Sequence, residues 1–424
     1  MSNTAAPNST QDKSVSPSTQ SAFRLPNFRR YWIARLCATL ATQMQGVAIC
    51  WQVYTMTQRP LDLGFVGLAQ FLPALCLTLV TGHVADRYDR RRILSICTVV
   101  EALCTLLFLN LTISGNTDAR WIFALLFLFG FAKAFEFPAA ISLMPNLVPP
   151  QQFVNAAAWN SSAWQVATIV GPAIGGLLYA FGPAVVYASC GLLFLSSAVL
   201  INFVHVERAL TERKAATWAS VVAGITFIRN QPLVLGAISL DLFAVLLGGA
   251  TALLPIYARD ILHVGPWGLG FLRSAPAAGA LTMAIWLARH PITADAGSRL
   301  LGAVGLFGGA TICFGVSQSV LLSLIMLAIL GAADMVSVVV RRVLVQVATP
   351  DEMRGRVSAV EAVFIGASNE LGEFESGLTA AWFGVVPAVV LGGAGTVAIV
   401  VLWAYLFPQL RRVDTLENLA QSKL

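Results

Sequence analysis

Long apolar runs, each about as long as a membrane helix, recur along this chain and are separated by short charged segments. A helix that spans a membrane needs about 20 predominantly apolar residues, so the 424 residues have room for about twelve such helices. Only 11% of the residues are charged, whereas a soluble domain usually carries about 25%. The sequence therefore predicts an all-α integral membrane protein with twelve transmembrane helices.

The basic residues predict how these helices are oriented. Most of the 27 Lys and Arg residues fall at one side of the predicted helices. The exceptions are Arg35, Arg59, Arg120, Lys133, Arg259 and Arg273. Basic segments remain in the cytoplasm during membrane insertion, so we expect both termini to be cytoplasmic. The net charge of +6 then reflects topology, and we expect no binding to nucleic acid.

Polar segments divide the chain into five parts. Residues 1–22, rich in Ser, Thr, Gln, Asn and Pro, are expected to be a disordered cytoplasmic tail. An N-terminal half of six helices (23–203) and a C-terminal half of six helices (232–408) follow. The polar stretch 204–231 between them is expected to contain a linker and an amphipathic helix at the membrane surface. Residues 409–424 would form a second cytoplasmic tail.

A charged segment at 82–92 interrupts two of the long apolar runs. Four of the six residues 87–92 are arginine, and they cannot lie in hydrocarbon. We therefore expect a tight cytoplasmic loop between two membrane helices. It contains Gly82, Asp86, Arg87, Arg90 and Arg91. A loop whose charges serve only topology is the alternative to one with a conformational role.

The predicted helix at 153–180 contains Gly171-Pro172-Ala-Ile-Gly175-Gly176. Proline bends a helix, and small residues allow two helices to approach closely. The segment therefore predicts a bent, closely packed membrane helix. An ordinary contact between small residues is the alternative to a specific functional motif.

An internal repeat is visible when the chain is shifted by 201 residues. The matched pairs are Gly130 with Gly331, Pro149 with Pro350, Ala158 with Ala359, Gly171 with Gly372, and Gly176 with Gly377. One constant offset over about fifty residues indicates duplication. It predicts two pseudo-symmetric halves with substrate bound between them. The two repeats differ in charge at two aligned positions, since Lys133 aligns with Asp334 and Pro172 aligns with Glu373.

Polar side chains inside the predicted helices are the candidates for a binding site, and the acids among them can take up a proton. A charge that faces lipid costs about 2.5–3.5 kcal/mol, so these side chains predict a polar central cavity. The candidates are Gln43, Gln45, Lys133, Glu136, Asp241, Asp334, Glu370 and Glu373.

Alternative roles exist for several of these charges. Lys133 could pair within its own helix with Glu136, three residues further on. The acids near residue 370 could be satisfied by neighbouring hydroxyls and amides. We expect Arg35 to extend its charge to the membrane interface, and Glu101 to lie on a helix that faces lipid.

Three segments together resemble the major facilitator superfamily of transporters. The 82–92 segment resembles the loop between helices 2 and 3 of that superfamily, although Asp89 stands where the family usually has Gly. The Gly-Pro-x-x-Gly-Gly core at 171–176 is similar to the antiporter motif of exporting members. Residues 349–358 are similar to the enterobactin-exporter group of bacterial facilitators. The resemblance covers most of residues 23–410.

The resemblance implies proton-driven export of a siderophore or another bulky amphipathic molecule across a bacterial inner membrane. It also implies that helices 1, 4, 7 and 10 line a central cavity, and that the basic loop latches the cytoplasmic side closed. A drug or macrolide efflux pump and a proton-coupled importer of an organic solute are the alternatives. The expected partners are a small-molecule substrate, protons and the lipid bilayer, and we expect a monomer.

A membrane-embedded enzyme would require clustered nucleophiles or metal ligands. The seven cysteines and four histidines are dispersed, and no metal-like pair or Ser-His set converges. We therefore expect no enzymatic activity, no cofactor and no metal. A channel is a further alternative, but it does not explain the repeat.

Overall fold

The computed structural model describes residues 21–116, 118–205, 218–292 and 294–413. Most of both predicted tails, and residues 206–217 of the predicted linker, lie outside these ranges. Within the described ranges the regular structure is entirely helical.

The N-terminal half is built from six long helices. They are α1 (Pro26–Thr57), α2 (Pro60–Arg87), α3 (Arg90–Ile113), α4 (Ala119–Leu143), α5 (Phe153–Tyr179) and α6 (Pro183–Asn202). A single 3-10 turn at Ala22–Arg24 precedes α1, and two more, Met144–Leu147 and Pro150–Gln152, connect α4 to α5.

The C-terminal half follows a shorter helix, α7 (Trp218–Asn230), in the predicted linker. Its helices are α8 (Pro232–Leu247), α9 (Leu254–Ile256), α10 (Gly265–Arg289), α11 (Ala296–Gly315), α12 (Val320–Ala348), α13 (Asp351–Phe383), α14 (Val385–Leu406) and α15 (Pro408–Arg411). A 3-10 turn at Ala250–Leu253 leads into α9, and a π-helical turn at Tyr257–Ile261 follows it. Arg259 and Asp260 lie in this π-helical turn.

Ten helical segments in the described chain are long and apolar enough to cross a membrane. They include the composite segment Pro232–Ile261 formed by α8, α9 and their turns. The helices α5 and α13, of 27 and 33 residues, also have sufficient length but carry more polar residues. With them the structure has the twelve long helical segments that the sequence predicts. The helix α13 begins at Asp351, directly after Pro350.

Local sequence explains where several helices begin. Proline occupies the first turn of α1, α2, α6, α8 and α10, where its missing N–H is not needed. Asp89 caps α3, because its carboxylate accepts hydrogen bonds from the backbone N–H groups of Arg91 and Arg92. The residue that departs from the superfamily pattern therefore starts the helix after the basic loop.

The internal repeat is visible in the helix contacts within each half. A Cβ placed on Gly130 of α4 would lie 2.1 Å from the backbone oxygen of Gln70 in α2. A Cβ on Gly331 of α12 would lie 1.9 Å from the backbone oxygen of Pro276 in α10. These distances are too short for any side chain, so both positions require glycine. The two contacts are equivalent, which confirms the predicted pseudo-symmetry.

The two halves meet through a second pair of equivalent contacts. Gly176 of α5 packs against Pro266 and Gly270 of α10, with the Pro266 oxygen 2.5 Å from a Cβ placed on Gly176. Gly377 of α13 packs in the same way against Pro60 and Gly64 of α2. At these points the helix backbones of the two halves approach each other closely, because glycine has no side chain to keep them apart.

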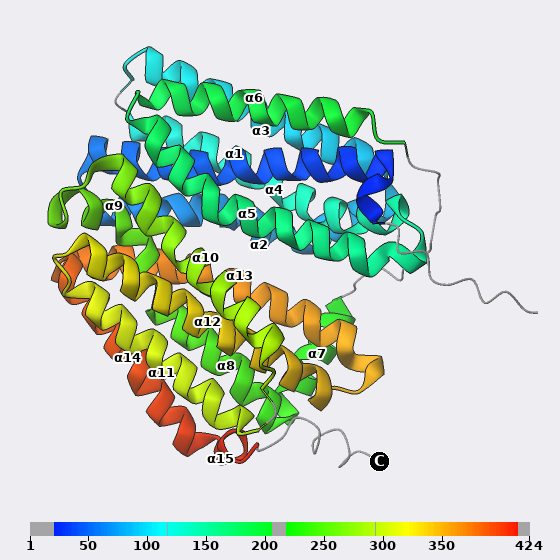
Figure 1. Ribbon diagram of the computed structural model, residues 1–424, viewed down its shortest axis with the longest axis vertical. Helices are drawn as coiled ribbons and strands as arrows, with labels where there is room; N and C mark the ends of the chain where they lie inside the picture. The colour runs from blue at the N-terminus through cyan, green and yellow to red at the C-terminus, as the bar shows by residue number, and fades with distance from the viewer. Residues whose placement is uncertain (1–20, 117, 206–217, 293, 414–424) are drawn as a thin grey trace, which may run out of the picture.

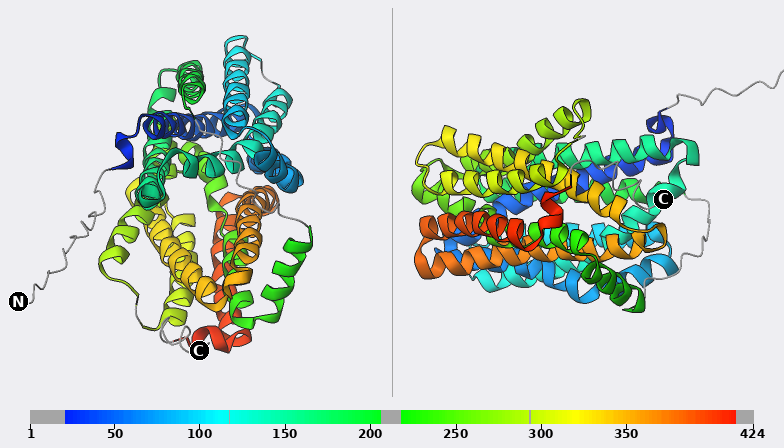
Figure 2. Two further views of the ribbon diagram at one scale, coloured as in Figure 1. Left: turned by 90° about the vertical axis from the view of Figure 1, so that its right-hand side faces the viewer. Right: turned by 90° about the horizontal axis from the view of Figure 1, so that it is seen from below.

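All these contacts between the halves lie towards one end of the molecule. We call the end that carries residues 82–92 and the start of α1 the basic-loop end, and the opposite end the far end. Gly176 and Gly377 lie close to the far ends of α5 and α13. Figure 1 shows the two groups of helices close together near α9 and diverging towards α7, and Figure 2 shows them from two further sides. The halves are therefore closed at the far end.

Candidate functional site

Three clusters of charged side chains lie within the helices. The first, the N-half quartet, consists of Arg35, Glu101, Lys133 and Glu136. The second, the C-half cluster, consists of Asp241, Asp334, Arg341 and Glu361. The third, the interface triad, consists of Arg273, Glu370 and Glu373. Every acid and lysine among the sequence candidates belongs to one of them.

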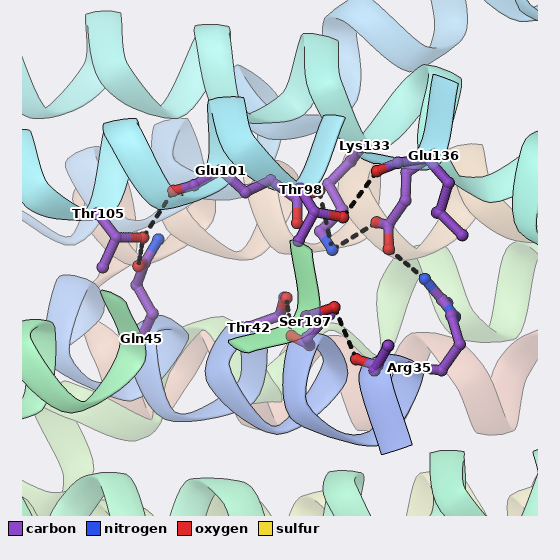
Figure 3. Close-up of polar contacts among 12 residues, drawn as sticks. Arg35, Thr42, Gln45, Thr98, Glu101, Thr105, Lys133, Glu136 and Ser197 are labelled. Carbon is purple, nitrogen blue, oxygen red and sulfur yellow. Dashed lines mark hydrogen bonds and ion pairs between the residues drawn. The ribbon is translucent and has the colours of Figure 1, made fainter. Parts of the chain in front are cut away.

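The N-half quartet joins α1, α3 and α4 (Figure 3). The Lys133 Nζ lies 2.6 Å from Glu136 Oε2 and 3.2 Å from Glu101 Oε1. Arg35 forms an ion pair with the other oxygen of Glu136. Two cations therefore face two carboxylates, and the formal charges balance. The pairing of Lys133 with Glu136 is the alternative that the sequence left open, and it is present in this conformation.

The helix that carries Glu101 exposes apolar side chains on another face, but Glu101 itself is 0% exposed and lies beside Lys133. One expectation for this region is wrong. Arg35 does not extend to the membrane interface, because Glu136 holds it inside the half. A signal for Glu101 was present in the sequence, since Thr98, Glu101 and Thr105 are spaced to share one helix face. All three are fully buried.

The two candidate glutamines of α1 lie against different helices. Gln43 packs on α5, where its Cβ lies 2.6 Å from a Cβ placed on Gly171. Gln45 is 2% exposed, and its side-chain oxygen accepts a hydrogen bond of 2.6 Å from the Thr105 hydroxyl (Figure 3). Gln45 therefore holds α1 against α3 inside the N-terminal half.

The C-half cluster is organised around Arg341 of α12. One guanidinium nitrogen, Nη1, lies 3.2 Å from Asp241 of α8 and 3.2 Å from Glu361 of α13. Asp334 lines a small cavity together with Asp241 and Ser337. Arg341 and Glu361 were not among the sequence candidates, since no spacing within one helix connects these two residues.

The interface triad lies where the halves meet. Oxygens of Glu370 and Glu373 lie 2.8 Å from the position that a Cβ on Gly67 of α2 would occupy. The absence of a side chain at Gly67 therefore makes room for both carboxyls. Arg273 of α10 interacts electrostatically with both acids. Its guanidinium also donates to the backbone oxygen of Gly46 in α1 at 3.3 Å.

The remaining acid of this part of α13 lies outside the triad. Glu375 accepts a hydrogen bond of 2.6 Å from the Thr379 hydroxyl one turn further along the same helix. At the far end, Tyr54 of α1 donates a hydrogen bond to Asp260, and Arg259 lies over the Tyr54 ring at 5.7 Å from its centre. Tyr54 and Asp260 belong to different halves, so this hydrogen bond joins them.

The hydrogen bonds of the basic loop to other segments, within the described residues, go to its own half. Arg90 donates to the backbone oxygens of Ala85 and Ser142 at 3.3 and 3.1 Å. Arg91 donates to the backbone oxygen of Val204 at 2.9 Å. A Cβ placed on Gly82 would have no neighbour within 4 Å, and Arg87 is exposed. The side chain of Asp86 lies outside the described residues.

The Gly-Pro segment of α5 packs against both halves. Gly171 contacts Gln43, and Gly175 contacts the backbone of Met44, so both glycines lie against α1. Gly176 instead faces α10 of the other half. Pro172 lies inside the helix, next to the same α10 contact. The segment therefore packs α5 between a helix of its own half and a helix of the other.

Relatives of this chain are membrane transporters. An MFS-type transporter of Bacillus subtilis, YfiS, named as uncharacterized, is 27% identical over 355 residues, or 80% of this chain and 83% of that protein. The enterobactin exporter EntS of Shigella boydii is 25% identical over 398 residues, or 91% and 93% of the two chains.

Solved structures share the fold at low sequence identity. The POT family transporter PepTSo has a TM-score of 0.69 at 11% identity, covering 91% of this chain and 98% of that one. A bacterial homologue of the iron transporter ferroportin, in an inward-facing state, has a TM-score of 0.66 at 16% identity, covering 93% and 100%.

A family model described as transmembrane secretion effector, MFS_3, matches residues 17–424. The match spans both halves and all three charged clusters, and the relatives and the fold agree with it. The chain therefore belongs to the transmembrane secretion effectors of the major facilitator superfamily, and it is a multi-pass membrane transporter, not an enzyme.

Proposed function

We propose that this transporter exports a bulky, amphipathic, siderophore-like molecule in exchange for protons by alternating access. The observation that carries the proposal is the interface triad, which places two carboxyls and one arginine where the halves meet. A group that couples proton movement to a conformational change has to sit where the conformational change alters its surroundings. The triad lies at such a place, because its three residues belong to the C-terminal half and face Gly67 and Gly46 of the N-terminal half.

The orientation of the chain follows from its charges. The basic-loop end carries Arg87 at the end of α2, and Arg90, Arg91 and Arg92 at the start of α3. We infer that this end is cytoplasmic, since basic loops are retained there. The contacts at the far end then close the periplasmic side, and the conformation is open to the cytoplasm. An exporter takes up its substrate in this conformation.

The charge balance of the triad supports its role as the proton site. Arg273 can balance one carboxylate, while Glu370 and Glu373 both lie beside Gly67. Two carboxylates that share a poorly hydrated site and one cation cannot both remain ionised at low cost. We infer that the triad binds one proton while the periplasmic side is closed. Movement of α2 away from α13 would hydrate the acids and release it.

The relative named as an enterobactin exporter supports a siderophore-like substrate. Gly171, Pro172, Gly175 and Gly176, similar to the antiporter motif, support export over import. A drug or macrolide pump is the second candidate function. The vesicle transport assay described below distinguishes it from a siderophore exporter.

Two further parts of the proposal concern the opposite end. Lys133 and Asp334 occupy equivalent positions in the two halves, and we propose that they meet when the cytoplasmic side closes. In the present conformation Lys133 is bound to Glu101 and Glu136. We also propose that the basic loop latches that closed state, and the open space beside Gly82 would allow another helix to approach there.

The test uses everted membrane vesicles, whose cytoplasmic face is outward, from a host that lacks its own exporter. We expect an interior-acid pH gradient to drive uptake of enterobactin, and an uncoupler to stop it. Glu370→Gln and Glu373→Gln should each reduce gradient-driven uptake at least tenfold. Both should retain exchange of labelled for unlabelled enterobactin, because exchange requires no net proton movement.

Glu375→Gln is the matched control. It makes the same change on the same helix, but Glu375 bonds to Thr379 outside the triad. Its gradient-driven uptake should match the unmodified protein. Retained gradient-driven uptake in both triad variants would place proton coupling elsewhere. Uptake of erythromycin without uptake of enterobactin would favour the drug pump.

A further inference from the structure

A cavity of about 210 Å³ lies between α12 and α13 at the basic-loop end. Its polar lining residues are Arg342, Gln346, Thr349, Arg354, Ser358 and Glu361. It is separate from the interface triad, which lies nearer the far end of α13. None of its residues except Glu361 belongs to the charged clusters.

The cavity faces the space between the two halves. On α13, Ser358 and Ala362 line it, and Gly366 follows Ala362 one turn later on the same helix face. Gly366 lies opposite Phe71 of α2, which belongs to the other half. The face of α13 that contacts the N-terminal half therefore continues into the cavity. At this end the halves have diverged, so the cavity opens between them.

The charge of the cavity is positive. Arg342 is exposed and forms no ion pair with any residue that the structure describes. Arg354 pairs with Asp351 at 2.8 Å, but Asp351 is 85% exposed, so water weakens that pair. Glu361 is balanced by Arg341 at 3.2 Å. Arg342 is the cation that remains available to a ligand.

Three of the equivalent positions in the N-terminal half hold exposed apolar side chains. The 201-residue offset places Ile141 at the position of Arg342, Phe153 at that of Arg354, and Trp164 at that of Ile365. The side chains of Ile141, Phe153 and Trp164 are 54%, 40% and 52% exposed. Halves related by an axis along the membrane normal present equivalent positions to the same central space. A cationic wall and an aromatic wall therefore face each other across it.

We propose that this pair of walls is the entry site for the substrate, and that the substrate is an amphipathic anion. Its carboxylate, phenolate or sulfonate group would bind Arg342 and Arg354, since arginine forms paired hydrogen bonds with such groups. Its flat apolar part would lie on Phe153 and Trp164. The inference deepens the proposed export function and rests on it for the role of the site.

Two fluorescent probes test the charge requirement directly. 8-Anilinonaphthalene-1-sulfonate carries the anion, and N-phenyl-1-naphthylamine is the same ring system without the sulfonate. Titrations use the purified full-length protein in a neutral detergent, with empty micelles as background. Arg342→Gln should weaken binding of the sulfonate about tenfold, as expected for loss of one hydrogen bond to a charged group. It should leave the neutral probe unchanged.

Matched variants complete the experiment. Arg342→Lys should keep part of the sulfonate affinity because the charge remains. Arg299→Gln removes an exposed arginine at the start of α11, outside the cavity, and should change neither probe. Trp164→Ala should weaken both probes, since both carry the ring system. Unchanged sulfonate affinity in Arg342→Gln, or an equal loss for the neutral probe, would overturn the proposal.

Competition experiments test whether the anion bound at this site is a substrate or a lipid. Enterobactin should displace the sulfonate probe from the unmodified protein. Displacement by dioctanoyl phosphatidylglycerol, without displacement by enterobactin, would overturn the assignment to substrate and identify a lipid site. Binding is measured without a pH gradient. Its result therefore does not depend on the result of the transport assay.

Discussion

Replacing Lys133 by methionine should destabilise the protein through the carboxylate that it leaves behind. Glu136 would keep Arg35 as its partner. Glu101 would lose the one cation within 4 Å of it among the described residues. Removing one partner of a buried ion pair costs about 3–5 kcal/mol. Because 29% of the Lys133 side chain is exposed, we expect a cost of about 3 kcal/mol, at the lower end of that range.

The assay is equilibrium unfolding in mixed micelles of dodecylmaltoside and sodium dodecyl sulfate, followed by tryptophan fluorescence. The loss should be larger at pH 8.5 than at pH 6, because a proton can neutralise the unpaired carboxylate at the lower pH. The double variant Lys133→Met with Glu101→Leu removes both charges. Replacing a whole buried pair by apolar residues is often neutral, so the double variant should be more stable than Lys133→Met alone.

Two results would refute this reasoning. A cost below about 1 kcal/mol for Lys133→Met would show that the pair contributes no more than an exposed one. A double variant whose cost equals the sum of the two single costs would show that the residues do not interact.

Three further predictions concern the two ends of the molecule. Gly176→Ala should shift the population towards a state open at the far end, measured by cysteine labelling there, whereas Gly302→Ala, with no neighbour within 4 Å, should not. Tyr54→Phe removes the hydrogen bond to Asp260 and should shift the same equilibrium about tenfold, as expected for loss of a hydrogen bond to a charged group. Arg90→Ala should reduce transport but leave the protein in the membrane; normal turnover would leave the basic loop with a topological role only.

The fold was predictable because its signals are local and repeated. Apolar runs set the twelve helical segments, and one offset identified the glycines at which helices touch. Gly130 and Gly331 show why this works, since a position with a backbone oxygen about 2 Å from a Cβ accepts no other residue. The same requirement for glycine applies at the equivalent contact of each half. It is therefore visible as a repeat within a single sequence.

The charged clusters were only partly predictable. Lys133 and Glu136 lie three residues apart on one helix, so their pairing was foreseeable. The burial of Glu101 was not predicted, because its polar neighbours on the same helix face were overlooked. Arg341 meets Asp241 and Glu361 from two other helices. Partners on separate helices depend on helix rotation and depth, which hydropathy alone does not define.

The interface triad arises where the repeat is broken. An offset of 206 residues relates α2 to α10, since Pro60 and Gly64 make the contacts that Pro266 and Gly270 repeat. The same offset places Gly67 of α2 at the position of Arg273 in α10. One interface between the halves therefore has an empty space where the other has a cation.

The partner helices differ in a complementary way. Glu373 of α13 stands where α5 has Pro172, and Glu370 stands where α5 has an isoleucine. The acids thus lie on the interface that Gly67 leaves open, and Arg273 extends towards them from the other interface. The equivalent backbone contacts let the two halves move about a common axis. The differences between the two interfaces place charge on one side of that axis only. Substituting Gly67 by alanine would displace both acids without altering any charge, so its transport defect should match that of the acid variants.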